Sequence, residues 1–283
     1  MAEPLKNQFG ADVPTLLAQS IAAVYPSFAS KAFVKDALSG FEALELTGRG
    51  RHLAAALHRH LPAHYPQAVD ILVRASALPP NRSVASGMAG FFFMPHCFFV
   101  AEHGLDHLAE SFAAQHALTQ KFTCEFSIRP FLMHHPEATL AQLRIWAGDP
   151  SDRVRRLVSE GTRPRLPLAM RLPAFQADPR PVLELLEMLK DDAALYVRRS
   201  VANNLNDIGK DNPDVLVKVA KRWLVKAGPE REWVVRHALR WAVKQAEPGA
   251  LKALGYGKTA THEIASAAIS PQTGSRSKSA ALN

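Results

Sequence analysis

Asp152-Arg153-Val154-Arg155-Arg156-Leu157-Val158 decides the fold of this 283-residue chain, because the same pattern returns twice further along. The second copy is Leu195-Tyr196-Val197-Arg198-Arg199-Ser200-Val201, and the third is Trp233-Val234-Val235-Arg236-His237-Ala238-Leu239. Each copy places basic side chains on an apolar sequence with helical spacing. Aligned on Val154, Val197 and Val235, the copies lie 43 and 38 residues apart. That period predicts two-helix units that stack on one another.

The rest of the chain also indicates helices rather than strands. Helical spacing recurs in residues 16–23, 28–38, 50–60 and 68–78, and again in residues 105–118, 122–133 and 137–146. Proline and glycine separate these segments, and residues 79–104 are predicted to be irregular. We therefore expect an all-α, HEAT-like helical-repeat solenoid that forms one domain over residues 1–256. Residues 257–283 lose the periodicity and predict a flexible C-terminal tail.

Positive charge is concentrated in the repeat half of the chain. Residues 151–283 carry 23 Lys and Arg against 14 Asp and Glu, whereas residues 1–150 carry 11 against 12. Because equivalent residues of stacked repeats line one surface, the recurring arginines predict a basic strip along a concave face. Such a strip favours a polyanion as the partner, most simply nucleic acid. The alternative is a basic solvated surface that binds nothing in particular.

Several other classes of protein are disfavoured by what the sequence lacks. Only Cys97 and Cys124 are present, so we expect buried free thiols and a reducing, cytoplasmic compartment. The N-terminus lacks the layout of a signal peptide, and the apolar run 88–100 is too short to span a bilayer. The histidines match no metal motif, and glycine-rich phosphate loops are absent. We therefore expect no metal, no cofactor and no membrane partner.

Two carboxylates stand in unusual surroundings. Glu125 lies in an otherwise apolar helical segment, and Glu160 lies among arginines near a predicted helix end. Ion pairing explains either acid: Glu125 with Arg129 at i,i+4, and Glu160 with Arg156 or Arg163. The functional alternative is that a carboxylate inside a basic face meets the cationic part of an otherwise anionic ligand.

Polar and aromatic clusters near the repeats each have two interpretations. Asparagines are weak helix formers, so Asn203 and Asn204 favour hydrogen bonds to phosphates or to neighbouring helix ends. Phe91-Phe92-Phe93 suggests base stacking, but a helix packed on all sides is the favoured interpretation. Trp146 is the nearest candidate aromatic for a lesion or sugar contact, and a buried core position is its alternative.

Three ordered motifs carry a resemblance to a known family. They are Phe126-Ser127-Ile128-Arg129-Pro130-Phe131-Leu132 behind Glu125, Val154-Arg155-Arg156-Leu157-Val158-Ser159-Glu160-Gly161-Thr162-Arg163-Pro164-Arg165-Leu166-Pro167, and Val197-Arg198-Arg199-Ser200-Val201-Ala202-Asn203-Asn204-Leu205-Asn206-Asp207. The chain resembles the AlkC-type DNA alkylation-repair glycosylases of the HEAT-like AlkC/AlkD superfamily. The similarity extends from Pro4-Leu5-Lys6 to Leu254-Gly255-Tyr256.

The resemblance implies a monofunctional glycosylase of base excision repair, without a cofactor. Its expected substrates are cationic N-alkylated bases in double-stranded DNA, chiefly 3-methyladenine and also 3-methylcytosine, which it removes without flipping the lesion into a deep pocket. The family's fold implies a C-shaped solenoid that grips bent DNA, and its catalytic acids correspond to Glu125 and Glu160. A monomer is expected, because a solenoid presents one continuous surface.

The basic strip supplies the predicted DNA contacts. Some of its arginines must instead pair with Asp192, Asp207 or Glu232. The predicted contacts are Arg156, Arg163, Arg165, Arg198, Arg199, Asn203, Asn204 and Arg236.

The chain departs from the family at one informative position. Related sequences commonly have tryptophan after Arg-Pro-Arg-Leu-Pro, where this chain has Leu168. An aromatic ring there suits stacking on a sugar or cationic base, so Leu168 predicts altered affinity or lesion range. The C-terminal immunoglobulin-like extension of some members is also expected to be absent. Two other functions stay open: a non-catalytic HEAT-repeat scaffold that binds DNA, and a damage sensor that excises slowly.

Overall fold

The computed structural model describes residues 5–78 and 89–256, and the predicted tail at 257–283 lies outside them. Every regular element in the described residues is helical, which confirms the predicted all-α class. The α-helices are α1 (Val13–Val24), α2 (Ser30–Leu38), α3 (Leu46–His60), α4 (Tyr65–Ser76), α5 (Met94–His103), α6 (Leu108–Thr119), α7 (Glu125–His134), α8 (Pro136–Trp146), α9 (Asp152–Gly161), α10 (Pro173–Ala177), α11 (Arg180–Leu189), α12 (Leu195–Asp211), α13 (Pro213–Leu224), α14 (Pro229–Lys244) and α15 (Pro248–Ala253). Short 3₁₀ turns are η1 (Leu5–Gln8), η2 (Phe41–Ala43) and η3 (Ala89–Phe93).

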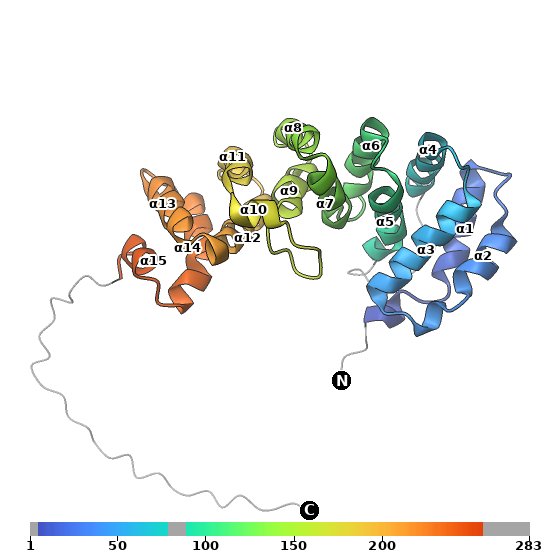
Figure 1. Cartoon of the computed structure of the whole chain (residues 1–283), viewed down its shortest axis with the longest axis horizontal. Coiled ribbons are helices and arrows are strands. Elements are labelled where there is room, and N and C mark those ends of the chain that lie inside the picture. The colour runs from blue at the N-terminus through green and yellow to red at the C-terminus, as the bar shows by residue number, and fades with distance from the viewer. Residues whose placement is uncertain (1–4, 79–88, 257–283) are drawn as a thin grey trace, which may run out of the picture.

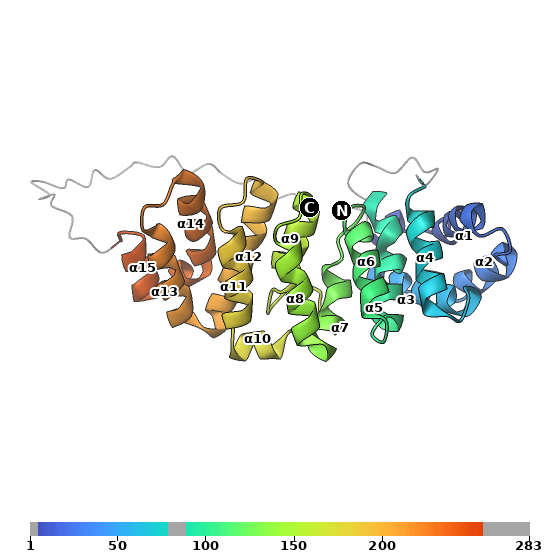
Figure 2. The ribbon, with the colours of Figure 1, turned by 90° about the horizontal axis from the view of Figure 1, so that it is seen from above.

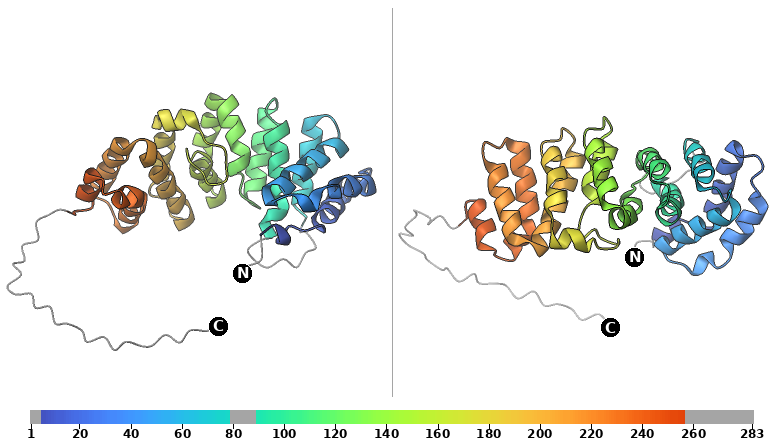
Figure 3. Two further views of the ribbon diagram at one scale, coloured as in Figure 1. Left: turned by 60° about the horizontal axis from the view of Figure 1, so that its bottom comes forward. Right: turned by 45° about the horizontal axis from the view of Figure 1, so that its top comes forward.

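The helices form two rows that curve into an arch (Figure 1). The inner row is α3, α5, α7, α9, α12 and α14, and each of these helices packs against the next. The outer row is α4, α6, α8, α11 and α13, and the two rows lie side by side along the whole arch (Figures 2 and 3). The inner row lies on the concave side of the arch (Figure 1).

The repeat pattern produces the inner helices because its apolar residues share one face. In α9 the buried residues include Val154, Leu157 and Val158, which follow the i, i+3, i+4 spacing of an amphipathic helix. The same register buries Val197 and Val201 in α12 and continues in α14. The basic residues between these positions therefore lie outside the apolar face of each helix.

The prediction of an irregular segment over residues 79–104 is wrong in its second half, because α5 occupies Met94–His103. Pro95 lies in the first turn of this helix, where its missing N–H breaks no helical hydrogen bond. Phe92, Phe93, Phe98 and Phe99 are buried, which confirms the packed interpretation of the phenylalanine cluster.

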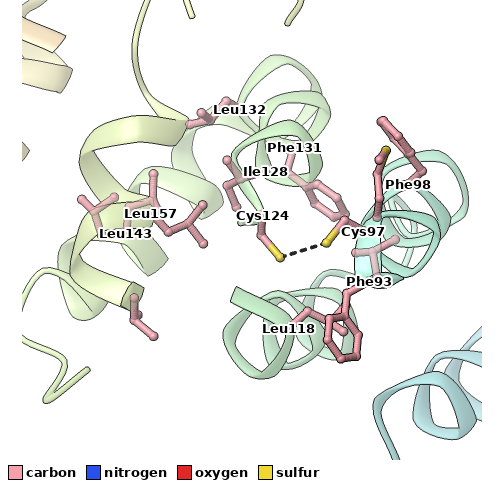
Figure 4. Close-up of a cluster of buried hydrophobic side chains, with 14 of the residues drawn as sticks. Phe93, Cys97, Phe98, Leu118, Cys124, Ile128, Phe131, Leu132, Leu143 and Leu157 are labelled. Carbon is pink, nitrogen blue, oxygen red and sulfur yellow. Dashed lines mark hydrogen bonds between the residues drawn. The ribbon is translucent and has the colours of Figure 1, made fainter. Parts of the chain in front are cut away.

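The two cysteines lie close together in the core between α5 and the start of α7. Cys97 of α5 and Cys124, just before α7, are buried free thiols with their sulfurs 3.4 Å apart (Figure 4). Phe93, Leu118 and Phe131 belong to the same core cluster. Burial raises the pKa of Cys124 well above its ordinary value, so the thiol stays protonated. The prediction of buried free thiols is confirmed.

Among the described residues, no helix is long and apolar enough to cross a lipid bilayer.

Gly104, which ends α5, permits a close approach of three elements. A Cβ atom there would lie 2.5 Å from Tyr65 Oη and 2.7 Å from the Val100 carbonyl oxygen, and it would also meet Ser111 Oγ. Tyr65 Oη and Ser111 Oγ are hydrogen-bonded at 2.7 Å, so the added methyl group would separate them. We expect Gly104→Ala to lower the free energy of unfolding by about 1–3 kcal/mol, measured by urea denaturation.

Gly148→Ala provides the control for this prediction. A Cβ atom at Gly148 would lie 3.7 Å from the Ile145 carbonyl oxygen, which is an ordinary contact distance. If the two alanine variants had the same free energy of unfolding, the close contacts at Gly104 would not exclude a larger side chain there.

Candidate active site

Glu125 begins α7 with its carboxylate buried. Burial raises the pKa of Glu125 above its ordinary value of 4.5, because removal of water disfavours the charged form. The charge of Arg156 and the backbone N–H of the helix start oppose this shift, while the nearby charge of Glu160 adds to it. The structure thus brings the two predicted acids into one electrostatic environment.

Arg156 of α9 links the two acids directly. Its Nη1 donates to Glu125 Oε2 at 3.1 Å and to Thr123 Oγ1 at 2.6 Å. Its Nη2 lies 3.4 Å from Glu160 Oε1. One guanidinium group therefore bridges Glu125 and Glu160 across the α7–α9 boundary, a geometry that suits its planar fork.

Glu160 is fixed by further donors on both of its oxygens. Arg163 Nη1 donates to Oε1 at 2.7 Å, and Ser200 Oγ of α12 donates to Oε2 at 2.6 Å. The predicted pairing of Glu160 with Arg156 or Arg163 is confirmed, because both arginines contact it. The carboxylate is therefore held in one orientation by residues of two successive inner helices.

Arg163 continues the network to a third carboxylate. Its Nε donates to Asp207 Oδ2 of α12 at 2.8 Å, and Lys210 Nζ donates to Oδ1 of the same residue at 2.9 Å. Arg163 and Asp207 are both buried. Because a buried charge needs a partner, this pair fixes the position of Arg163 beside Glu160.

The predicted pairing of Glu125 with Arg129 is wrong. Arg129 is fully buried and donates to the backbone carbonyls of Gly161, Arg163 and Met170. These carbonyls belong to the end of α9 and the loop that follows it. Burial, together with the charge of Arg163, lowers the pKa of Arg129 to about 10. Arg129 thus anchors the loop that follows Glu160.

Several arginines of the predicted basic strip are engaged inside the protein. Arg155 and Arg198 occupy equivalent repeat positions, and each donates to two carbonyls of the loop before its own helix: Arg155 to Asp149 and Pro150, Arg198 to Asp192 and Ala193. Arg165 pairs with Asp211 of α12. With Arg156 and Arg163 bound to the acids, four predicted phosphate contacts (Arg156, Arg163, Arg165 and Arg198) instead hold neighbouring elements together in this structure.

Arg199 and Arg236 differ from these residues. Both are exposed, and neither forms an ion pair within residues 5–78 and 89–256. Arg199 belongs to α12 and Arg236 to α14, so the free guanidinium groups lie beyond the acids toward the C-terminal end of the arch.

Asn204 and Trp146 are buried, whereas Asn203 is half-buried and contacts α14. Asn204 is fully buried, and its Nδ2 donates to the Ser159 carbonyl at 2.6 Å, as the helix-end alternative expected. Asn203 Oδ1 accepts from Arg240 Nη2 at 3.0 Å. Trp146 is buried with its ring edge-on to Phe112. Trp146 therefore occupies the buried core position that was its alternative interpretation. Neither Trp146 nor Asn204 is exposed enough to touch a ligand.

Three residues that complete the site were not predicted from the sequence: Thr123, Ser200 and Tyr196. The guanidinium carbon of Arg156 lies 5.3 Å from the centre of the Tyr196 ring, which is 45% exposed. Ser200 contacts Glu160 from 40 residues further on, about one repeat away. The sequence signal that could have indicated Ser200 is its place about one repeat after Glu160, because stacked repeats bring such residues into contact.

Leu168 extends from the loop that Arg129 anchors. Its side chain is 92% exposed, and its φ of 61° is unusual for a residue other than glycine. An apolar side chain displayed in a strained backbone conformation is held there by the surrounding structure. The loop therefore presents this position to solvent.

Among the described residues, no group of three His, Cys, Asp or Glu side chains is placed to hold a metal ion. The chemistry available at the site is that of the two buried carboxylates, the bridging guanidinium and the hydroxyl groups of Thr123 and Ser200. This arrangement is suited to stabilising positive charge that develops in a substrate.

The fold and this site define a helical-repeat protein with an arginine-bridged carboxylate pair on its inner row. No protein-family model matches the chain. The uncharacterized protein YhaZ of Bacillus subtilis (strain 168) is 39% identical over 253 residues, which cover 89% of this chain and 68% of YhaZ. The Pseudomonas fluorescens alkylpurine DNA glycosylase AlkC, solved bound to DNA containing an abasic site analog, matches with a TM-score of 0.82 and 38% identity over 90% of this chain and 69% of AlkC. The chain belongs to the AlkC family.

Proposed function

We propose that this protein is a monofunctional DNA glycosylase that removes cationic N-alkylated bases from double-stranded DNA. The proposed substrates are 3-methyladenine and 3-methylcytosine, and the product is an abasic site. The observation that carries the proposal is the carboxylate pair Glu125 and Glu160, bridged by Arg156, in a chain 38% identical to AlkC. In a repeat protein that served only as a scaffold, these carboxylates would act only as ion-pair partners of Arg156 and Arg163.

The proposed reaction requires no acid to protonate the base. An alkylated adenine or cytosine already carries positive charge, so its glycosidic bond can break as the sugar acquires oxocarbenium character. Glu125 and Glu160 together stabilise that charge and position or deprotonate the attacking water. Arg156, Arg163 and Ser200 keep both carboxylates in place, so little reorganisation is needed during the reaction.

Single-turnover release of 3-methyladenine from methylated duplex DNA tests the proposal. Wild-type protein in excess over DNA is expected to release the base well above the spontaneous rate. Binding of the same duplex without release above that rate would overturn the proposal and favour the HEAT-repeat scaffold or the damage sensor.

The raised pKa of Glu125 predicts the pH dependence of the reaction. The carboxylate form is the one that stabilises the cation, so the single-turnover rate should fall as the pH drops through a pKa above 4.5. Because burial favours the protonated form, this loss occurs at a higher pH than for an exposed glutamate. The pH profile of the rate is measured after subtracting spontaneous release at each pH. In Glu125→Gln, the fall in rate at low pH is expected to disappear.

Restoring an aromatic side chain at the exposed loop position tests the role of Leu168. We expect Leu168→Trp to bind methylated duplex about two- to tenfold more tightly, because a large ring adds contact area and attraction to a cationic base. The measurement is the dissociation constant for methylated duplex compared with unmethylated duplex. Equal affinity of Leu168→Trp and wild type would show that this position does not contact the lesion.

A further inference from the structure

We propose that the groove between the first turns of α12 and α14 binds one nucleotide of the DNA strand, with its base on Trp233 and its phosphate on Arg199. The groove has a volume of about 400 Å³ and is lined by Leu195, Arg198, Arg199, Pro229, Glu230 and Trp233. The two helices are neighbours in the inner row (Figures 1 and 2). The inference rests on the proposed function only in taking DNA as the ligand.

Trp233 provides a fixed aromatic surface at this groove. Its indole is 36% exposed and stacks on the His237 ring, with ring centres 5.0 Å apart and planes inclined by 8°. His237 Nε2 is in turn 3.2 Å from Asn203 Oδ1, which also accepts from Arg240. The imidazole behind the indole is thus held in place, so the exposed part of the indole is oriented before any base arrives. A pre-oriented aromatic ring is what base stacking uses, and stacking tolerates any base.

Arg199 provides the charge that a phosphate needs. It is exposed, lines the groove and has no ion-pair partner among the described residues. Burial lowers the pKa of the nearby His237 imidazole, and the charges of Arg240 and Arg199 add to this shift. Indole and guanidinium both line this groove. Against the single carboxylate of Glu230, the two lining arginines leave one net positive charge, which matches one phosphate.

The groove adjoins the acids, which identifies the nucleotide as one near the damaged position. Leu195 lines the groove, and the next residue, Tyr196, covers Arg156 between Glu125 and Glu160. Because both sites lie on consecutive inner helices, a single strand that passes the acids continues into the groove. We expect Trp233 and Arg199 to hold the strand in register with the acids.

Binding measurements that do not depend on base release test this inference. The probe is a duplex containing a tetrahydrofuran abasic-site analogue, titrated into wild type, Trp233→Leu, Arg199→Gln and Lys218→Gln. Lys218 is exposed on α13 in the outer row, so its loss matches the change in net charge without touching the groove. We expect Trp233→Leu to bind roughly 10-fold or more weakly. We expect Arg199→Gln to reduce the slope of log affinity against log salt by about 0.9.

Intrinsic fluorescence gives a second readout with the protein unmodified. Stacking of a base on the exposed indole quenches Trp233, so the abasic duplex should quench wild type more than Trp233→Leu. Thermal melting of each variant establishes that it is folded. Affinities of Trp233→Leu and Arg199→Gln equal to that of Lys218→Gln would overturn the inference, even if wild type releases 3-methyladenine. If both variants bind the duplex weakly and wild type releases no base, the proposed groove is retained and the proposed glycosylase activity is rejected.

Discussion

Glu160→Gln is expected to slow single-turnover release of 3-methyladenine by about a hundredfold or more. The carboxylate is oriented by Arg163 and Ser200, so a charge that develops on the sugar meets a group already in place. Removing one such preorganised electrostatic group costs on the order of 3 kcal/mol of transition-state stabilisation. Because glutamine keeps nearly the same shape, affinity for the abasic product should change far less than the rate.

Glu184→Gln is the matched control for this measurement. Glu184 lies on α11 of the outer row, is 62% exposed and pairs with Arg144. Its substitution should leave base release at the wild-type rate. If Glu160→Gln released the base as fast as Glu184→Gln, while Glu125→Gln was also unaffected, the assignment of the carboxylate pair to catalysis would be rejected.

Arg129→Met is expected to produce the largest loss of stability, about 3–5 kcal/mol in the free energy of unfolding. The guanidinium donates to three backbone carbonyls of the α9 end and its loop. Methionine leaves the buried carbonyls of Gly161 and Arg163 and the partly buried carbonyl of Met170 without this donor. Each unsatisfied buried acceptor costs about 1–3 kcal/mol, and water entering the space offsets part of the sum. Urea denaturation measures the change.

Arg144→Met separates this effect from the loss of any arginine. Arg144 lies on α8 and is exposed in its pair with Glu184, so we expect a change below about 1 kcal/mol. A loss for Arg129→Met no larger than this would show that the loop does not depend on its buried anchor. Limited proteolysis gives an independent check, since loss of the anchor should expose the chain near Leu168.

The fold could be predicted from the repeat period and helical spacing, and a packed helix was the favoured interpretation of the phenylalanine cluster, but the bounds of α5 could not be predicted. Its sequence combines phenylalanines with Gly90 and Pro95, which suggest irregular structure when taken alone. In the folded chain Pro95 begins a helix, and the phenylalanines fill the space between neighbouring helices. Tertiary packing therefore decides the structure of this segment, and local propensity does not report it.

The candidate site shows a similar division. Glu125 and Glu160 stand out because carboxylates are unusual in such surroundings, yet their partners do not. Spacing within one helix suggested Arg129 as the partner of Glu125, whereas the actual partner is Arg156 on another helix. Contacts between repeats depend on how two helices are rotated against each other, and a single sequence does not contain that rotation. The prediction that some arginines pair with Asp192, Asp207 or Glu232 did not say which arginines do so, and in the structure Arg155 pairs with Asp192 and Arg163 with Asp207.

The bridge formed by Arg156 has a consequence for how this protein can diverge. Its bonds, like the bond from Ser200 to Glu160, join helices that are immediate neighbours in the inner row. In a stacked array each unit depends chiefly on the units beside it. The helical pairs at the far N-terminal end can therefore be exchanged or recombined with little effect on the acids. The central units, in contrast, must be inherited together, because a change in any one of them displaces a partner held by the next.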